Sequence, residues 1–205
     1  MRACSLQPLR QLYILKIVVG FRDIFFCIMN NTLIFGLSRV EDSLDDLYSE
    51  DYVASMGQLL EIAACEEILA WAQYAVVSPY LVGEERANIE ELFNTNAKDE
   101  LDDHFWKLQN RMNELQYVPK TLFDFSKIQS TARCEYHIPT DVADLVTLLK
   151  QNIESEECAI RTYQNIIMVA RDNSDFVTER IAKEIQDDEA QHLSDLNDFL
   201  ADLES

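Results

Sequence analysis

Glycine and proline are both scarce in this sequence. The chain of 205 residues has four glycines and four prolines, whereas average proteins contain about 7% glycine and about 5% proline. Because tight turns depend on these residues, we expect few turns and long secondary-structure elements. The shortage argues against a β-sandwich, a β-barrel and a Rossmann-type sheet. Apolar residues still make up 48% of the chain, so it can bury a core.

Basic residues are scarce as well. The chain has 17 Lys and Arg against 37 Asp and Glu, which gives a formal net charge of −20. Because contacts with a phosphate backbone need Lys and Arg, we expect no direct binding to nucleic acid. An acidic surface attracts cations instead, metal ions included.

Long apolar runs and closely spaced cysteines are also missing. The stretch from Leu12 to Met29 is interrupted by charged residues, so it lacks the roughly 20 apolar residues that a membrane-spanning helix needs. The five cysteines include no CxxC pair and are too few for a disulfide scaffold. We therefore expect a cytoplasmic protein without a membrane anchor.

The charge is distributed unevenly along the chain. Residues 1–40 have a net charge of +4, and residues 41–205 have a net charge of −24. We therefore predict an N-terminal extension, residues 1–45, followed by one acidic domain, residues 46–205. The extension has two interpretations. It is either absent from the working protein, with translation beginning at Met29, or a targeting segment that is removed.

From about Asp51 onward, apolar residues recur at intervals of three and four, which indicates amphipathic helices. Four helices of about 25 to 30 residues are predicted. The first closes at Gly83 and is disturbed near its end by Pro79. The second begins near Glu85, the third follows Pro139 with Thr140 as its N-cap, and the fourth starts at Ser174. No alternating pattern typical of strands is seen.

The links between these helices differ in length. The first and third links are short, but about 25 residues, Gln116–Pro139, separate the second helix from the third. Such a segment can run along the bundle, so that the second and third helices become parallel. The sequence therefore predicts an all-α, ferritin-like four-helix bundle with a long crossover between helices two and three.

Acidic residues and histidines interrupt the apolar faces of all four helices. Four carboxylates in a dry bundle interior would repel one another, but two divalent cations would neutralise them. Four glutamates and two histidines form the ligand set of carboxylate-bridged di-iron or di-manganese sites. The candidate metal ligands are Glu67, Glu100, His104, Glu156, Glu189 and His192.

The spacing of the two Glu–His pairs differs. Glu189 and His192 are three residues apart, and Glu100 and His104 are four apart, but either spacing keeps both side chains on one helical face. Asp102 and Asp103 are expected on the outer surface. The third histidine, His137, lies in the crossover and is interpreted as structural.

Three segments carry a specific resemblance: 97–105 (AKDELDDHF), 154–163 (ESEECAIRTY) and 184–192 (EIQDDEAQH). They resemble the Dps-like branch of the ferritin superfamily, the thioferritins, which are mini-ferritins with a bacterioferritin-like di-iron site. The resemblance runs from about Glu67 to His192. Its most specific element is the run Glu156–Ala159, which contains Cys158, together with Cys134 upstream.

The resemblance implies a function and a site. The six candidate residues would be catalytic and would bind two iron ions per subunit, with manganese or zinc as other metals that the site could hold. Cys134 and Cys158 would form a redox cysteine pair beside the metals. The protein would be a ferroxidase that oxidises Fe²⁺ with hydrogen peroxide and stores ferric mineral in a cage of twelve subunits, which protects against oxidative stress.

Two other functions remain open. The first is a di-metal oxidase or peroxidase of the rubrerythrin or manganese-catalase kind, which stores no iron. The second is a non-catalytic helical bundle that binds partners through its acidic surface. Tyr163 and Tyr74 lie about two helical turns from a candidate ligand, and each is either an electron carrier or a core tyrosine.

Overall fold

A computed structural model of the protein shows two compact units, residues Met1–Leu47 and Tyr48–Ser205. The structure describes residues 13–19, 22–29, 32–38, 47–137 and 141–205. In the part of the chain that is described, no helix is long and apolar enough to cross a membrane.

The first unit contains an antiparallel sheet of three strands in the order β1-β2-β3. The strands are β1 (Tyr13–Val19), β2 (Arg22–Met29) and β3 (Thr32–Ser38). In the register, Lys16 pairs with Phe25, and Phe26 pairs with Phe35. The sequence shows no alternating pattern typical of strands, yet this extension contains these strands. Its short runs of Ile, Val and Phe suit a strand as well as an apolar targeting segment.

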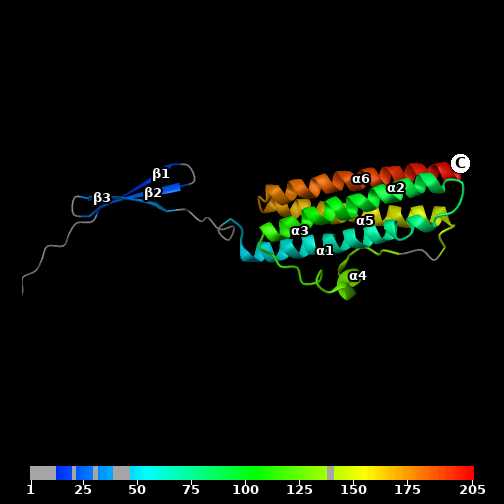
Figure 1. Ribbon diagram of the computed structural model, residues 1–205, viewed down its shortest axis with the longest axis horizontal. Coiled ribbons are helices and arrows are strands. Elements are labelled where there is room, and N and C mark those ends of the chain that lie inside the picture. Colours follow the sequence, from blue (N-terminus) through cyan, green and yellow to red (C-terminus); the bar gives the residue numbers. More distant parts are fainter. Residues whose placement is uncertain (1–12, 20–21, 30–31, 39–46, 138–140) are drawn as a thin grey trace, which may run out of the picture. The chain divides into compact units, whose positions relative to one another are not determined.

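The second unit is the four-helix bundle that the sequence predicts (Figure 1). Its long helices are α1 (Glu50–Ala75), α5 (Leu145–Asp172) and α6 (Phe176–Glu204). The remaining long helix consists of α2 (Arg86–Asp99), a π-helical turn η3 (Glu100–His104) and α3 (Phe105–Glu114). The all-α fold is thereby confirmed for the acidic domain.

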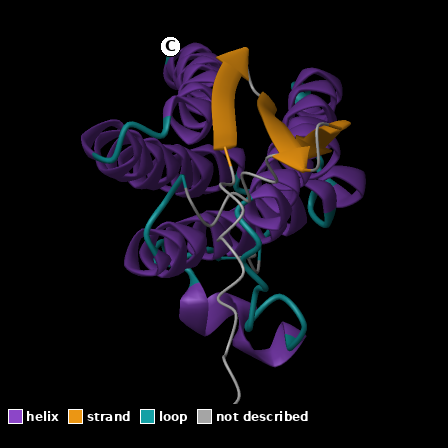
Figure 2. Cartoon of the chain, turned by 90° about the vertical axis from the view of Figure 1, so that its left-hand side faces the viewer, coloured by secondary structure: helices purple, strands orange, loops and turns teal. Residues whose placement is uncertain are grey.

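The direction of the helices confirms the long crossover. In Figure 1, α1 and α6 run in one direction, and α2, α3 and α5 run in the other. The connection from α3 to α5 contains two short helices, η4 (Phe125–Lys127) and α4 (Ile128–Thr131). Figure 2, which views the helices from one end, shows this connection on the outside of the bundle. The second and third long helices are therefore parallel.

Local signals set the helix ends. Helix α1 ends at Ala75, earlier than the predicted end at Gly83, and Pro79 lies in the following 3₁₀ turn η2 (Ser78–Tyr80) instead of in the last turn of α1. Helix α5 begins at Leu145, later than expected, because the Asp144 side chain caps it; Thr140 lies outside the described residues. Helix α6 begins at Phe176, capped by Asp175, rather than at Ser174.

The apolar core is divided into two clusters. Cluster 1 contains Leu60, Ala63 and Ile185, and cluster 2 contains Tyr74 and Leu196, each with further buried residues. Between these positions, α1 buries Glu67 and α6 buries Glu189 and His192. The bundle therefore has a buried polar layer with an apolar cluster on each side.

Candidate metal centre

The six candidate ligands lie together in this polar layer. They form two overlapping groups, and within each group the potential ligand atoms lie within 4.8 Å of one another. Glu100 and Glu189 belong to both groups. One group adds Glu67 and His104, and the other adds Glu156 and His192. We call these the His104 half and the His192 half of the site.

Both histidines point the same nitrogen into the site. Nδ1 of His104 lies 3.3 Å from Glu189 Oε1 and 3.4 Å from Glu67 Oε2. Nδ1 of His192 lies 3.2 Å from Glu189 Oε2 and 3.4 Å from Glu100 Oε1. All six side chains are buried, with 0% exposure for His104 and 5% for His192. Two imidazoles and four carboxylates are thus buried together in the interior of the bundle.

The π-helical turn explains the unequal spacing of the Glu–His pairs. The amide of Phe105 bonds to the carbonyl of Glu100, five residues earlier instead of four. This turn accommodates one extra residue. His104 therefore reaches the site although it follows Glu100 by four residues, whereas His192 follows Glu189 by three. The sequence predicted the shared face but gave no sign of the π-helical turn.

The outer nitrogen of each histidine faces an aspartate from the opposite helix. Nε2 of His104 lies 3.4 Å from Asp188 Oδ2, and Nε2 of His192 lies 3.5 Å from Asp99 Oδ2. A carboxylate in this position fixes the tautomer and the ring orientation of a ligating histidine. Neither aspartate was predicted as part of the site, although each directly precedes a shared glutamate, Glu100 or Glu189.

Two tyrosines hold the glutamates that belong to a single group. The hydroxyl of Tyr163 donates to Glu67 Oε1, and the hydroxyl of Tyr74 donates to Glu156 Oε1. Burial and the neighbouring glutamates raise the pKa of both hydroxyls well above the usual value. Each tyrosine therefore remains protonated and can donate its hydrogen bond.

The electrostatics of the site show a shortage of positive charge. Burial, then repulsion by Glu189 and Glu100, raises the pKa of Glu67 and of Glu156 well above the usual value. Burial also raises the pKa of Glu100, but hydrogen bonds from both histidines outweigh it and lower that pKa. Burial lowers the pKa of His192, but hydrogen bonds to Glu100 and Glu189 raise it to about 11.

Three carboxylate oxygens in the site lie 3.3 to 3.4 Å from a histidine Nδ1 but accept no well-formed hydrogen bond from the described residues: Glu67 Oε2, Glu100 Oε1 and Glu189 Oε1. Buried carboxylate oxygens of this kind are costly unless a cation or a donor reaches them. The oxygen and imidazole donors fit two divalent cations, one in each half.

The structure also places the cysteines, Asp103 and His137 that the sequence singled out. Cys134 and Cys158 form a disulfide between the crossover and α5, and the backbone amide of Cys134 donates to the buried Glu66. Asp103 is half-exposed and pairs with Lys107, as expected of surface charge, and it also lies within 4.8 Å of His104 and Asp188. His137 lies outside the site with its side chain 61% exposed.

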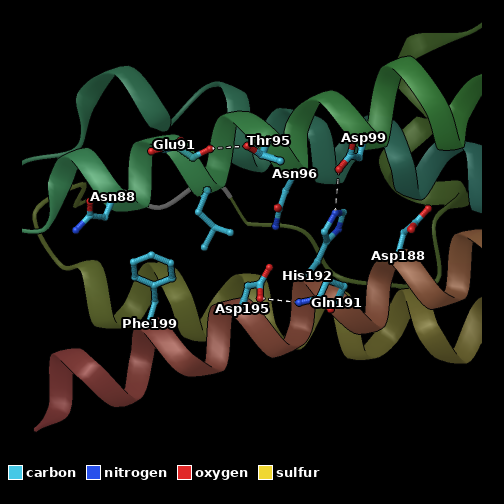
Figure 3. Close-up of a pocket in the computed structure, with 11 residues that line it drawn as sticks. Asn88, Glu91, Thr95, Asn96, Asp99, Asp188, Gln191, His192, Asp195 and Phe199 are labelled. Atoms are coloured by element: carbon cyan, nitrogen blue, oxygen red, sulfur yellow. Dashed lines mark hydrogen bonds and ion pairs between the residues drawn. The ribbon is translucent and has the colours of Figure 1, made fainter.

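A cavity of about 450 Å³ lies between α2 and α6, and His192 alone of the six candidate ligands lines it. Figure 3 shows Asn96 and Asp99 pointing from α2 toward His192. The carboxylates of Glu91, Asp99, Asp188 and Asp195 also line this cavity. The His192 half is therefore the side of the site that a small molecule or cation can approach.

Comparisons with known proteins agree with this geometry. The ferritin-like domain family matches residues 57–205. A dodecameric thioferritin from Bacteroides fragilis, a bacterioferritin-related protein, is 38% identical, with a TM-score of 0.69 and coverage of 74% of this chain and 87% of that chain. No curated protein matches the chain.

Two more distant structures are similar in fold. The Dps homologue of the archaeon Halobacterium salinarum is 17% identical, with a TM-score of 0.70 and coverage of 78% of this chain and 87% of that chain. The bacterioferritin of Desulfovibrio desulfuricans is 21% identical, with a TM-score of 0.63 and coverage of 76% and 83%. The chain therefore belongs to the ferritin-like family and, within it, to the Dps-like, thioferritin branch.

Proposed function

We propose that the protein detoxifies and stores iron: it oxidises Fe²⁺ with hydrogen peroxide at a two-iron site within each subunit. The observation that carries this proposal is the pair of overlapping ligand groups that share Glu100 and Glu189. Shared carboxylates with unpartnered oxygens suit two neighbouring divalent cations. Carboxylate and imidazole ligands favour iron or manganese and also accept zinc.

Each ion would take one glutamate and one histidine of its own. Glu67 and His104 would hold the first Fe²⁺, and Glu156 and His192 the second, with the shared glutamates between them. Because the pKa values of Glu67, Glu156 and His192 are raised, these groups would release protons as Fe²⁺ binds.

In the proposed reaction each of two Fe²⁺ ions gives up one electron. Hydrogen peroxide takes both electrons and two protons, its O–O bond breaks, and two water molecules form. Both reactants that would otherwise generate hydroxyl radicals are consumed, so that the cell is protected from oxidative stress in the cytoplasm without DNA contact. Tyr74 and Tyr163 hold the carboxylates in place during these steps.

Storage requires assembly into a cage. The Bacteroides fragilis relative is a dodecamer, and we propose that this chain also forms a cage of twelve subunits. The net charge of −24 over residues 41–205 would draw cations toward such a particle. Iron retention together with a twelve-subunit mass supports storage, and a dimer would support the rubrerythrin-like or manganese-catalase-like alternative.

The disulfide suggests a redox role for Cys134 and Cys158. Reduction by a thiol would add two electrons and two protons and would free the crossover from α5. Cys158 lies two residues after Glu156, so that the cleavage could alter the position of this ligand. A change in iron release on reduction, absent in Cys134→Ser, would support this role.

The test uses pure protein, Fe²⁺ and hydrogen peroxide. Glu156→Ala and His192→Ala should abolish iron oxidation and leave helical content intact. Glu157→Ala is the matched control, because Glu157 is the exposed neighbour of Glu156. Wild-type protein that neither oxidises nor retains iron above background contradicts the proposal. The absence of any stoichiometric metal would instead favour a non-catalytic acidic module.

A further inference from the structure

The two halves of the site differ at the positions one helical turn before each glutamate. Asn96 precedes Glu100 by four residues, and Asn152 precedes Glu156 by four. The corresponding positions before Glu67 and Glu189 are apolar. All four side chains are buried at 0% or 1% exposure: Asn96, Asn152, Ala63 and Ile185.

Helix direction places these residues on opposite sides of the site. Because α2 and α5 are parallel and run against α1 and α6 (Figure 1), Asn96 and Asn152 lie on one side, and Ala63 and Ile185 lie on the other. Ala63 and Ile185 belong to apolar cluster 1. On this side apolar residues follow the glutamates directly, whereas on the other side two amides lie between the glutamates and apolar cluster 2.

The two amides are incompletely paired. Asn96 Nδ2 and Asn152 Oδ1 are buried without a hydrogen-bond partner in the described parts of the chain. Asn152 Nδ2 donates to the carbonyl of Leu148 at 2.8 Å, which fixes that amide. Because buried polar groups are normally satisfied, one free donor and one free acceptor beside the site indicate a small polar ligand.

The cavity leads to the amide side. Asn96 and His192 both line it, and Figure 3 shows the Asn96 side chain extending from α2 into the space beside His192. A small molecule that approaches His192 through this cavity therefore meets the Asn96 amide.

We propose that Asn96 binds the oxidant, hydrogen peroxide, by donating a hydrogen bond to one of its oxygens in the His192 half of the site. This inference rests on the proposed function. Hydrogen peroxide also carries O–H donors that suit the free Asn152 oxygen, whereas dioxygen has no hydrogen to donate. The amide holds the peroxide while its O–O bond accepts one electron from each Fe²⁺ and two protons, which yields two water molecules.

The experiment compares wild type with Asn96→Leu, which keeps the side-chain size and removes the donor. Ile185→Leu is the matched control at the corresponding position in the apolar side. Each protein is loaded with Co²⁺, the number of bound ions is measured, and azide is titrated while the cobalt absorption spectrum is recorded. Azide is the probe because it accepts hydrogen bonds and is not consumed. Peroxide-driven oxidation of Fe²⁺ is measured in parallel.

We expect two Co²⁺ per subunit in all three proteins. Azide should bind about tenfold more weakly to Asn96→Leu, a loss of about 1.4 kcal/mol, and the peroxide-dependent rate constant should fall by a similar factor. Ile185→Leu should match wild type in both measurements. If Asn96→Leu fails to fold, Asn96→Ala removes the same donor and gives the same readout.

Equal azide affinity in wild type and in the Asn96 variant, with both Co²⁺ ions bound, overturns the inference and leaves the proposed function intact. Loss of Co²⁺ in the Asn96 variant alone also overturns it, because the residue then supports the metal site and not the oxidant. Wild type that binds no Co²⁺ overturns both proposals.

Discussion

The His104 half and the His192 half of the site are built from the same parts in the same arrangement. Each has a glutamate held by a tyrosine from the other half's helix and a histidine faced by an aspartate from the opposite helix. An apolar cluster lies on each side, but the halves differ next to the glutamates, where the His104 half has Ala63 and Ile185 and the His192 half has a cavity and two amides. The comparison shows that the ligand set is duplicated, whereas the cavity lies beside one half alone.

The largest effect on the number of bound cations is expected from replacing a glutamate that both halves share. Glu100→Gln should remove both divalent cations, because Glu100 belongs to both groups. Glu156→Gln and Glu67→Gln should each remove one cation and leave the other half occupied. Co²⁺ titration followed by mass spectrometry of the native protein measures the number of ions. A full set of two ions in Glu100→Gln would contradict the shared role.

The pH dependence of the metal-free protein tests the charge of both halves. Since the pKa of His192 is raised from 6.5 to about 11, its stabilising effect is complete below pH 6.5 and is lost as pH rises toward 11. The raised pKa values of His104, Glu67 and Glu156 act in the same direction. The free energy of unfolding should therefore fall as pH rises above 6.5, as urea denaturation measures.

Bound Zn²⁺ should reverse this pH dependence, because metal affinity increases as the ligands lose protons. His192→Gln should weaken the pH dependence, whereas His137→Gln, at an exposed site in the crossover, should leave it unchanged. A metal-free protein whose stability is flat between pH 6.5 and pH 9 would contradict the raised pKa values.

The two outer aspartates should act on opposite halves. Asp188→Asn should weaken the ion held by His104, and Asp99→Asn should weaken the ion held by His192, each by about tenfold. This is the lower end of such effects because the two aspartate side chains are 51% and 45% exposed. Isothermal titration with Co²⁺ measures the two affinities. The same loss in both halves for one variant would rule out this crossed pairing.

The smallest effect is expected from giving the α2–α3 helix the same Glu–His spacing as α6. Deletion of Asp102 would leave two residues between Glu100 and His104, the same spacing as between Glu189 and His192, and would convert the π-helical turn into regular α-helix. Both cations should remain bound, with a change in stability of about 1 kcal/mol or less. Deletion of Asn110, in the regular helix α3, is the control and should destabilise the bundle, because Met112 and Leu115 would turn away from the core.

Much of the domain could be predicted because its signals are local. The repeat of apolar residues at three and four gave the helices, and the length of the link after Leu115 gave the crossover. The candidate ligands stood out because glutamate and histidine interrupt apolar faces. Helix starts were less accurate, since Asp144 and Asp175 compete as caps with nearby Thr and Ser residues.

The strands of residues 13–38 and the buried Glu61 could not be predicted in the same way. Strand formation in a short apolar run depends on pairing with other strands, which leaves no periodic signal. Glu61 looks like a surface charge in the sequence, but it accepts hydrogen bonds from the Tyr117 hydroxyl and the Leu122 amide of the crossover.

The sequence by itself determined the helical bundle and the types of ligand, because burial of an apolar face and the cost of burying charge depend on residue type and spacing. Only the tertiary structure decided which glutamates are shared, how the π-helical turn brings His104 into the site, and which side is open at His192. These features depend on contacts between helices that are distant along the chain. Asn96 and Ile185 each precede a glutamate by four residues. Because α2 and α6 run in opposite directions (Figure 1), these two positions fall on opposite sides of the site.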